Sequence, residues 1–129
     1  MNMGQMTGER QGIRVSSAVR DGAVAVYGEY GILADRQELS ALLASNMEAA
    51  ALRLESMGGI IGHMKASMDV HRVDSFSLTE REVSYREGSI EEIDIHLNVL
   101  VFAIEEEGAK KTVEQMFCDV DRKVKDLRE

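Results

Sequence analysis

The sequence predicts an α+β domain, in which an antiparallel β-sheet carries two α-helices packed on one face, in the approximate order β-α-β-β-β-α. Two segments, 35–57 and 109–127, repeat apolar residues at helical spacing, and each has a single apolar face. Segments around them alternate apolar and polar residues with the period of a strand. Such helices are expected to lie side by side on one face of the sheet and to leave the other face open.

Length and charge limit the class of protein. The chain has 129 residues with 44% hydrophobic content, so we expect a flexible N-terminal tail at residues 1–14 and a single α+β domain at residues 15–129. The formal net charge of −8 argues against a general surface for nucleic acids or anionic membranes, because such surfaces need clustered Lys and Arg. Cys118 is the only cysteine, and no segment has the ~20 apolar residues of a membrane span. We therefore expect a cytoplasmic protein.

The first element is ambiguous. Residues 23–27 fit a short buried strand, but the apolar residues between positions 15 and 30 also fit the stripe of a helix. A strand is favoured, because Gly22, Gly28 and Gly31 would each weaken a helix by about 1 kcal/mol.

The first helix has clear signals at both ends. Asp35 followed by Glu38 predicts a capping box at its start, and Gly58 with Gly59 predicts a left-handed stop at its end. Its apolar stripe consists of Leu39, Leu42, Leu43, Met47, Ala50, Leu54 and Met57.

The next part of the chain predicts a three-stranded antiparallel meander. Residues 60–68 alternate as a strand, in which the small Gly62 suits close packing of a helix, and residues 69–74 are expected to form a polar turn. Apolar positions change parity near residues 80–82, which requires a bulge or a break, and Gly88-Ser89 is expected to form the hairpin into the last strand. The predicted core positions are Leu43, Met47, Ile60, Met64, Ile95, Leu97, Phe117 and Val120.

The last predicted strand, residues 91–104, changes character partway along. Its first half alternates polar and apolar residues, whereas from Val99 onward both faces are apolar. If Val99 and its parity mates face the helices, then Leu100, Phe102 and Ile104 face away from them. Such an apolar patch usually marks an interface, so we expect it to be covered by a second copy or by residues 22–33 of the same chain.

Four polar residues on the same sheet face form a candidate ligand-binding cluster. These residues are His63, Lys65, Asp94 and His96. In this hypothesis His96 or Asp94 acts as a general base and Lys65 as an electrophilic or anion-binding partner. The alternative interpretation is that they are ordinary solvated residues on an outer face. Three histidines on separate elements do not predict a metal site unless it is shared between subunits, and no cofactor is expected.

The start of the last helix carries Lys110 and Lys111, which suggest an anion site unless the preceding glutamates neutralise them. The order helix, three strands, helix, with Gly108 and these lysines opening the last helix, has a faint similarity to double-stranded-RNA-binding domains. In that family, lysines at this position contact phosphates across the major groove, although Glu114 falls where another lysine is wanted here.

The sequence predicts a non-catalytic accessory or regulatory protein that binds and assembles. We expect a homo-oligomer, most simply a two-fold dimer, formed through the open sheet face. The alternatives are a ligand-binding protein or small enzyme that uses the four polar residues, and an RNA-binding domain of αβββα type.

Overall fold

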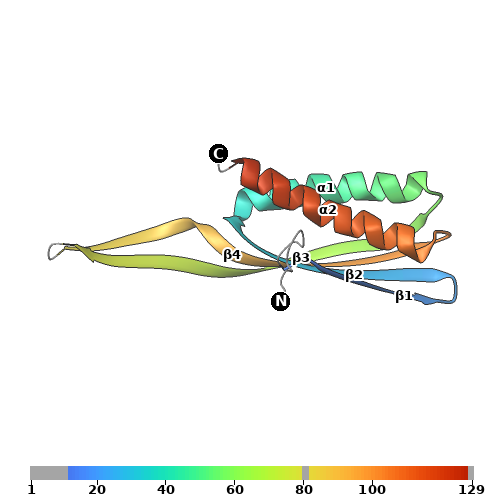
Figure 1. The fold of residues 1–129 in the computed structure, drawn as a ribbon, viewed down its shortest axis with the longest axis horizontal. Helices are drawn as coiled ribbons and strands as arrows, with labels where there is room; N and C mark the ends of the chain where they lie inside the picture. Colours follow the sequence, from blue (N-terminus) through green and yellow to red (C-terminus); the bar gives the residue numbers. More distant parts are fainter. Residues whose placement is uncertain (1–11, 80–81, 128–129) are drawn as a thin grey trace, which may run out of the picture.

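The computed structural model describes residues 12–79 and 82–127, with side chains at 12–71 and 90–127. It contains one four-stranded antiparallel sheet, with the strand order β1-β2-β4-β3, and two helices that lie on the same face of that sheet (Figure 1). This confirms the predicted fold class. The elements are β1 (Arg14–Arg20), β2 (Ala23–Asp35), α1 (Arg36–Ser56), β3 (Ile60–Thr79), β4 (Glu82–Phe102) and α2 (Glu106–Leu127).

The order of elements is ββαββα, because two strands precede α1 and two separate it from α2. Strands β1 and β2 form a hairpin whose turn residues, Asp21 and Gly22, have φ angles of 54° and 79°. Two consecutive left-handed residues are typical of the tight turn that joins twisted antiparallel strands. The strand interpretation of residues 23–27 is therefore confirmed, although the strand is longer than predicted, and the helix interpretation is wrong.

Helix α1 begins and ends as the sequence predicts. The Asp35 carboxylate accepts a hydrogen bond of 3.0 Å from the Glu38 amide, which satisfies a free donor in the first turn. At the other end Gly58 has a φ angle of 92°, and the Gly59 amide donates to the Leu54 carbonyl at 2.9 Å.

The three-stranded meander is wrong. Residues 69–74 continue β3, and Gly88 and Ser89 lie inside β4, so one hairpin of two long strands replaces the three short ones. The far half of this hairpin extends beyond both helices (Figure 1). The change in the alternation of apolar residues near residues 80–82 marks the turn of this hairpin, since Thr79 pairs with Glu82.

The core lies between the sheet and the helices. Of the predicted core residues, Leu43, Ile95, Leu97, Phe117 and Val120 are buried, and Met47 and Met64 pack partly buried against them. The prediction for Ile60 was wrong, because its side chain is 64% exposed. The register shifts between Ile61 and His63, and this bulge turns Ile61 toward the helices instead.

The close approach of helix and sheet occurs at Gly28 on β2. A Cβ atom at Gly28 would overlap the Phe117 ring and lie 3.1 Å from Val113 Cγ1, both on α2. Gly62 was expected to face a helix, and this prediction is wrong. A Cβ atom at Gly62 would meet Leu100 and Phe102 on the sheet face opposite the helices.

Candidate functional site: the outer face of the sheet

The outer face of the sheet is the one opposite the helices. Directly opposite residues of antiparallel strands share a face of the sheet. We call each row of directly opposite residues across the strands a rung. Two rungs at one end are apolar except for Arg20 on β1 and His63 on β3, and we call their apolar residues the apolar end. Its residues are Ala18 on β1, Ala23 and Ala25 on β2, Leu100 and Phe102 on β4, and Ile60 on β3.

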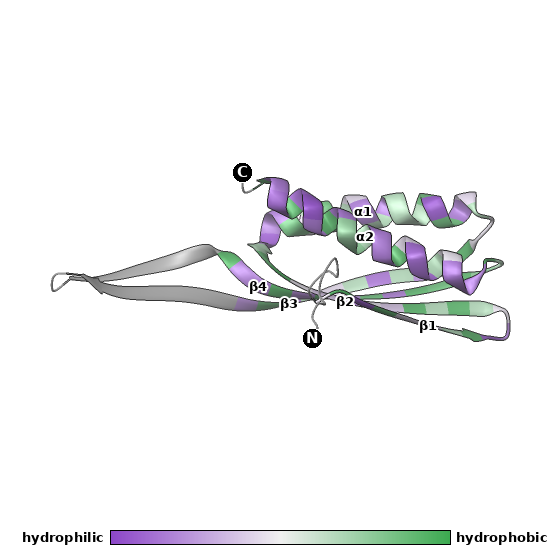
Figure 2. Ribbon diagram, in the orientation of Figure 1, coloured by the Kyte–Doolittle hydropathy of each residue, from purple (hydrophilic) through white to green (hydrophobic). Residues whose placement is uncertain are grey.

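The apolar end is shallowly hollowed. A depression of about 550 Å³ lies over the β1–β2 turn and reaches Leu100 and Phe102, and one of about 390 Å³ continues toward His63 and Asn98. Figure 2 shows hydrophobic residues gathered along the part of the sheet nearest the β1–β2 turn. The Phe102 side chain is 38% exposed. All four strands therefore contribute apolar side chains to one end of the outer face.

The outward placement predicted for Leu100 and Phe102 agrees with the register, whereas the outward placement predicted for Ile104 is wrong. Strand β4 ends at Phe102, and Ala103 has a left-handed φ angle of 62°. This turn ends the alternation of faces, and Ile104 packs against the core beneath the helices instead.

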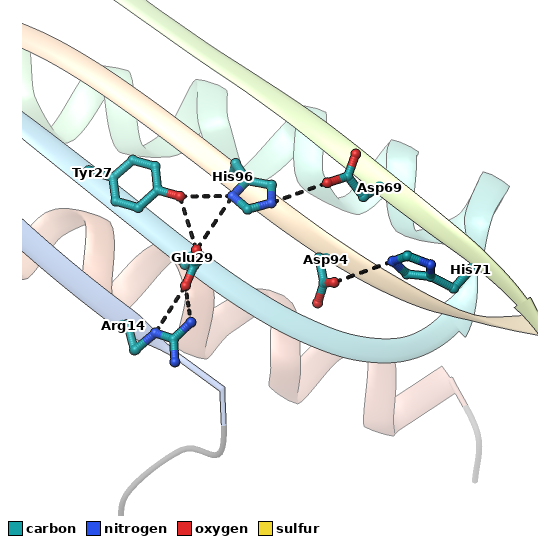
Figure 3. Close-up of polar contacts among 7 residues, drawn as sticks. All are labelled: Arg14, Tyr27, Glu29, Asp69, His71, Asp94 and His96. Carbon is teal, nitrogen blue, oxygen red and sulfur yellow. Dashed lines mark hydrogen bonds and ion pairs between the residues drawn. The ribbon is translucent and has the colours of Figure 1, made fainter.

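Farther along the outer face, polar side chains are joined in a network (Figure 3). We call this region the polar end, and it also contains the exposed Leu33. The Tyr27 hydroxyl donates to Glu29 Oε2 at 3.1 Å and lies 2.9 Å from His96 Nδ1. Arg14 Nε donates to the other oxygen of Glu29 at 3.0 Å. The remaining nitrogen of His96 lies 3.4 Å from Asp69 Oδ2. Four strands are thus linked through side chains.

Glu29 is the centre of this network. Its hydrogen bond from Arg14, followed by the one from Tyr27, holds the pKa of the Glu29 carboxyl below its ordinary value. The same bond to Glu29 raises the pKa of the Arg14 guanidinium. Partial burial raises the pKa of the Tyr27 hydroxyl, and its bond to Glu29 adds to this. The arrangement favours an ionised Glu29 between a cation and a neutral phenol.

The four predicted ligand-binding residues do not meet in one pocket. His63 stands opposite Leu100 and Lys65 opposite Asn98, one rung apart, whereas His96 and Asp94 belong to the next two rungs. His63 lines the depression at the apolar end. His96 and Asp94 line a separate depression of about 210 Å³. Lys65 lines neither. Asp94 pairs instead with His71, at 3.6 Å (Figure 3).

Sequence reasoning missed four members of the network, because each depends on which strands are neighbours. The period-two pattern of β2 does place its polar side chains on one face, but a single sequence does not show that β2 lies between β1 and β4. With that order known, the outward positions of β2 would have predicted the cluster. The missed residues are Arg14, Tyr27, Glu29 and Asp69.

Other site chemistry gains no support from the described residues. Among them, no group of three or more His, Cys, Asp and Glu side chains is placed to hold a metal ion. Neither helix is long and apolar enough to cross a membrane. The helix, three strands, helix order that suggested double-stranded-RNA-binding domains is not present, and Lys110 and Lys111 follow Glu106 and Glu107 in the first turns of α2.

Comparison with protein-family models, curated proteins and solved structures gives no match for this chain. Function is therefore inferred from the surface itself.

Proposed function

We propose that this chain is a non-catalytic assembly protein that self-associates through the outer face of its sheet. The observation that carries the proposal is the apolar end, to which all four strands contribute and over which the described residues place no helix or strand. The alternative cover, residues 22–33, is not available, because these residues lie within the sheet beside β4. A contiguous apolar patch of this kind usually marks an interface.

A second copy can pack on this surface because small and large apolar side chains lie next to each other on it. Ala18, Ala23 and Ala25 keep the centre low, while Leu100 and Phe102 stand beside them as larger side chains. Two such faces can interdigitate at the ~10 Å spacing of packed sheets. Full burial of a large side chain such as Phe102 contributes roughly 1.5 to 3 kcal/mol relative to leaving it in water.

Charge favours one orientation of the two copies. The polar end carries Glu29, Asp69, Asp94 and Glu92, and the whole chain has a net charge of −8. A two-fold axis that crosses the strands over the apolar end superposes the two apolar ends and directs the acidic ends away from each other. This arrangement avoids opposing like charges across the interface.

Replacement of Phe102 tests the proposal. Phe102→Asp places a negative charge in the outermost rung of the apolar end, and sedimentation should show a shift toward smaller species while circular dichroism shows an intact fold. The matched control is Leu52→Asp, because Leu52 is a 68% exposed apolar residue on α1, away from the outer face. A wild-type chain that stays monomeric at high concentration would exclude the proposal, as would equal effects of the two variants.

A further inference from the structure

The β3–β4 hairpin has a distal part that we call the arm, made of residues 72–79 of β3 and 82–89 of β4. Figure 1 shows the arm extending past the ends of both helices as two strands alone. Strand β2 pairs with β4 only as far as Asp35, opposite Ile90, where the chain turns into α1. Within the described residues, residues 82–89 of β4 therefore have no neighbour on the side that β2 occupies farther along.

Two strands alone are not a stable arrangement in water. An isolated hairpin is marginal, and a third strand or a packed helix is normally needed. The free edge also presents a row of unpaired backbone donors and acceptors, which attracts another strand. The arm is built from strand-forming residues, since Phe76 pairs with Tyr85 and Leu78 with Val83.

We propose that the arm binds the arm of a second copy, edge to edge, through antiparallel pairing of the two β4 strands centred on Ser84. The result is a four-stranded ribbon in which each β4 acquires the neighbour that β2 does not provide there. This surface is separate from the outer face, and the proposal does not rest on the proposed function.

The sequence of β4 is complementary to itself in this register. Centring on Ser84 sets Glu82 opposite the partner's Arg86 and Val83 opposite the partner's Tyr85, and two-fold symmetry gives each pair twice. Opposite charges, and an aromatic beside a β-branched residue, are favourable pairs across antiparallel strands. On the other edge of the arm, β3 carries charges at Arg72 and Asp74, where its register with β4 is irregular, and none at residues 75–79.

The space beside β4 also selects this register. With Ser84 at the centre, the partner's β4 begins at its Glu82, opposite Arg86, and stays clear of Ile90, where Asp35 already occupies the neighbouring position. Centring on Arg86 would bring the partner's Glu82 opposite Ile90, into that occupied position, and would set two arginines opposite each other. Of these two registers, the one centred on Ser84 fits the unpaired length of β4.

Cysteine cross-linking tests the pairing. In a Cys118→Ser background, which removes the only cysteine, Ser84→Cys places two thiols directly opposite each other across the two-fold axis. Opposite residues of antiparallel strands have Cα separations of about 4.5 to 5.5 Å, within the range that a disulfide spans. Mild oxidation should convert the monomer to a disulfide-linked dimer. The matched control is Ser77→Cys, since Ser77 pairs with Ser84 but lies on β3.

The proposal is overturned if Ser77→Cys cross-links in preference to Ser84→Cys, or if neither does.

A charge exchange tests the register: Arg86→Glu should reduce the yield of the Ser84→Cys dimer, and Glu82→Arg with Arg86→Glu should restore it. Absence of restoration would exclude the register. Cross-linking of Ser84→Cys should persist in the Phe102→Asp chain, and its loss there would show that the arm does not pair by itself. Melting curves monitor folding, which these changes should leave intact because the arm lies beyond the helices.

Discussion

At the scale of single residues, the outer face shows how a few side chains divide a sheet into two surfaces. Glu29 joins β1, β2 and β4, because Arg14 and Tyr27 use its two oxygens and His96 lies 3.7 Å away. These groups interact with one another within the chain. Among the residues that the structure describes, the apolar end has no comparable internal partner, and this is why we propose that a second copy covers it.

The lowered pKa of Glu29 makes a prediction about acid stability. Because the folded state favours the ionised carboxylate, the stabilisation is present above the ordinary pKa of about 4.5 and is lost as the pH falls through the lower folded value. Glu29→Gln removes this titration. Its melting midpoint should be lower than that of the wild type at neutral pH, and the difference should shrink as the pH falls below about 4.5.

Glu48→Gln is the control for this measurement, since Glu48 is an exposed carboxylate on α1. It should leave the pH dependence of the melting midpoint close to that of the wild type. If the difference in melting midpoint between Glu29→Gln and the wild type stays constant down to acid pH, the ion pair of Glu29 with Arg14 contributes nothing to stability.

At the scale of elements, the position of α2 is set by the residues of β2 that it covers. Gly28 admits the Phe117 ring, and two residues later the Tyr30 ring lies 5.6 Å from that ring, centre to centre. The Tyr30 hydroxyl donates to the buried Asp121 carboxylate, which also accepts from Lys125 at 2.9 Å. One strand thus fixes α2 through a missing side chain, an aromatic contact and a buried hydrogen bond.

Gly28→Ala should destabilise the fold. The added Cβ would overlap the Phe117 ring, and overpacking of this kind typically costs about 1 to 3 kcal/mol of unfolding free energy. The control is Gly108→Ala on α2, where a Cβ atom would lie 3.4 Å from Met57 Sδ in ordinary contact and where alanine favours the helix. Chemical denaturation measures both. Equal midpoints would mean that the sheet and α2 separate easily at Gly28.

The sequence predicts elements well where local chemistry decides them. The bounds of α1 follow from Asp35, Glu38 and Gly58, each of which acts on backbone groups within a few residues. Ile60 was misplaced because a bulge is a property of two paired strands, and the pairing of β3 with β4 is not visible in β3 alone. The network around Glu29 was missed for the same reason, since it requires the order of strands in the sheet.

At the scale of the whole molecule, the two proposed surfaces lie on different parts of the sheet, the apolar end of the body and the free edge of the arm. Each is self-complementary, so each generates its own two-fold axis. A chain with two such axes forms either a closed tetramer or an open, alternating array.

This geometry predicts the masses of three variants. Phe102→Asp should leave dimers joined by their arms, and Arg86→Glu should leave dimers joined by their outer faces. The chain with both changes should be monomeric, while the wild type should exceed a dimer. Sedimentation with native mass spectrometry distinguishes these states. A wild type no larger than a dimer would show that only one of the two surfaces operates.

Asp35 has a further role that follows from its position. It is both the last residue of β2 and the N-cap of α1. The residue that starts the helix is therefore also the point beyond which β4 has no neighbour on the β2 side within the described residues. Moving that boundary by two residues along the chain would lengthen β2 and shorten the vacancy beside β4. The position of the helix cap would then determine how long a strand a second copy can add beside β4, and so whether the two copies can pair there.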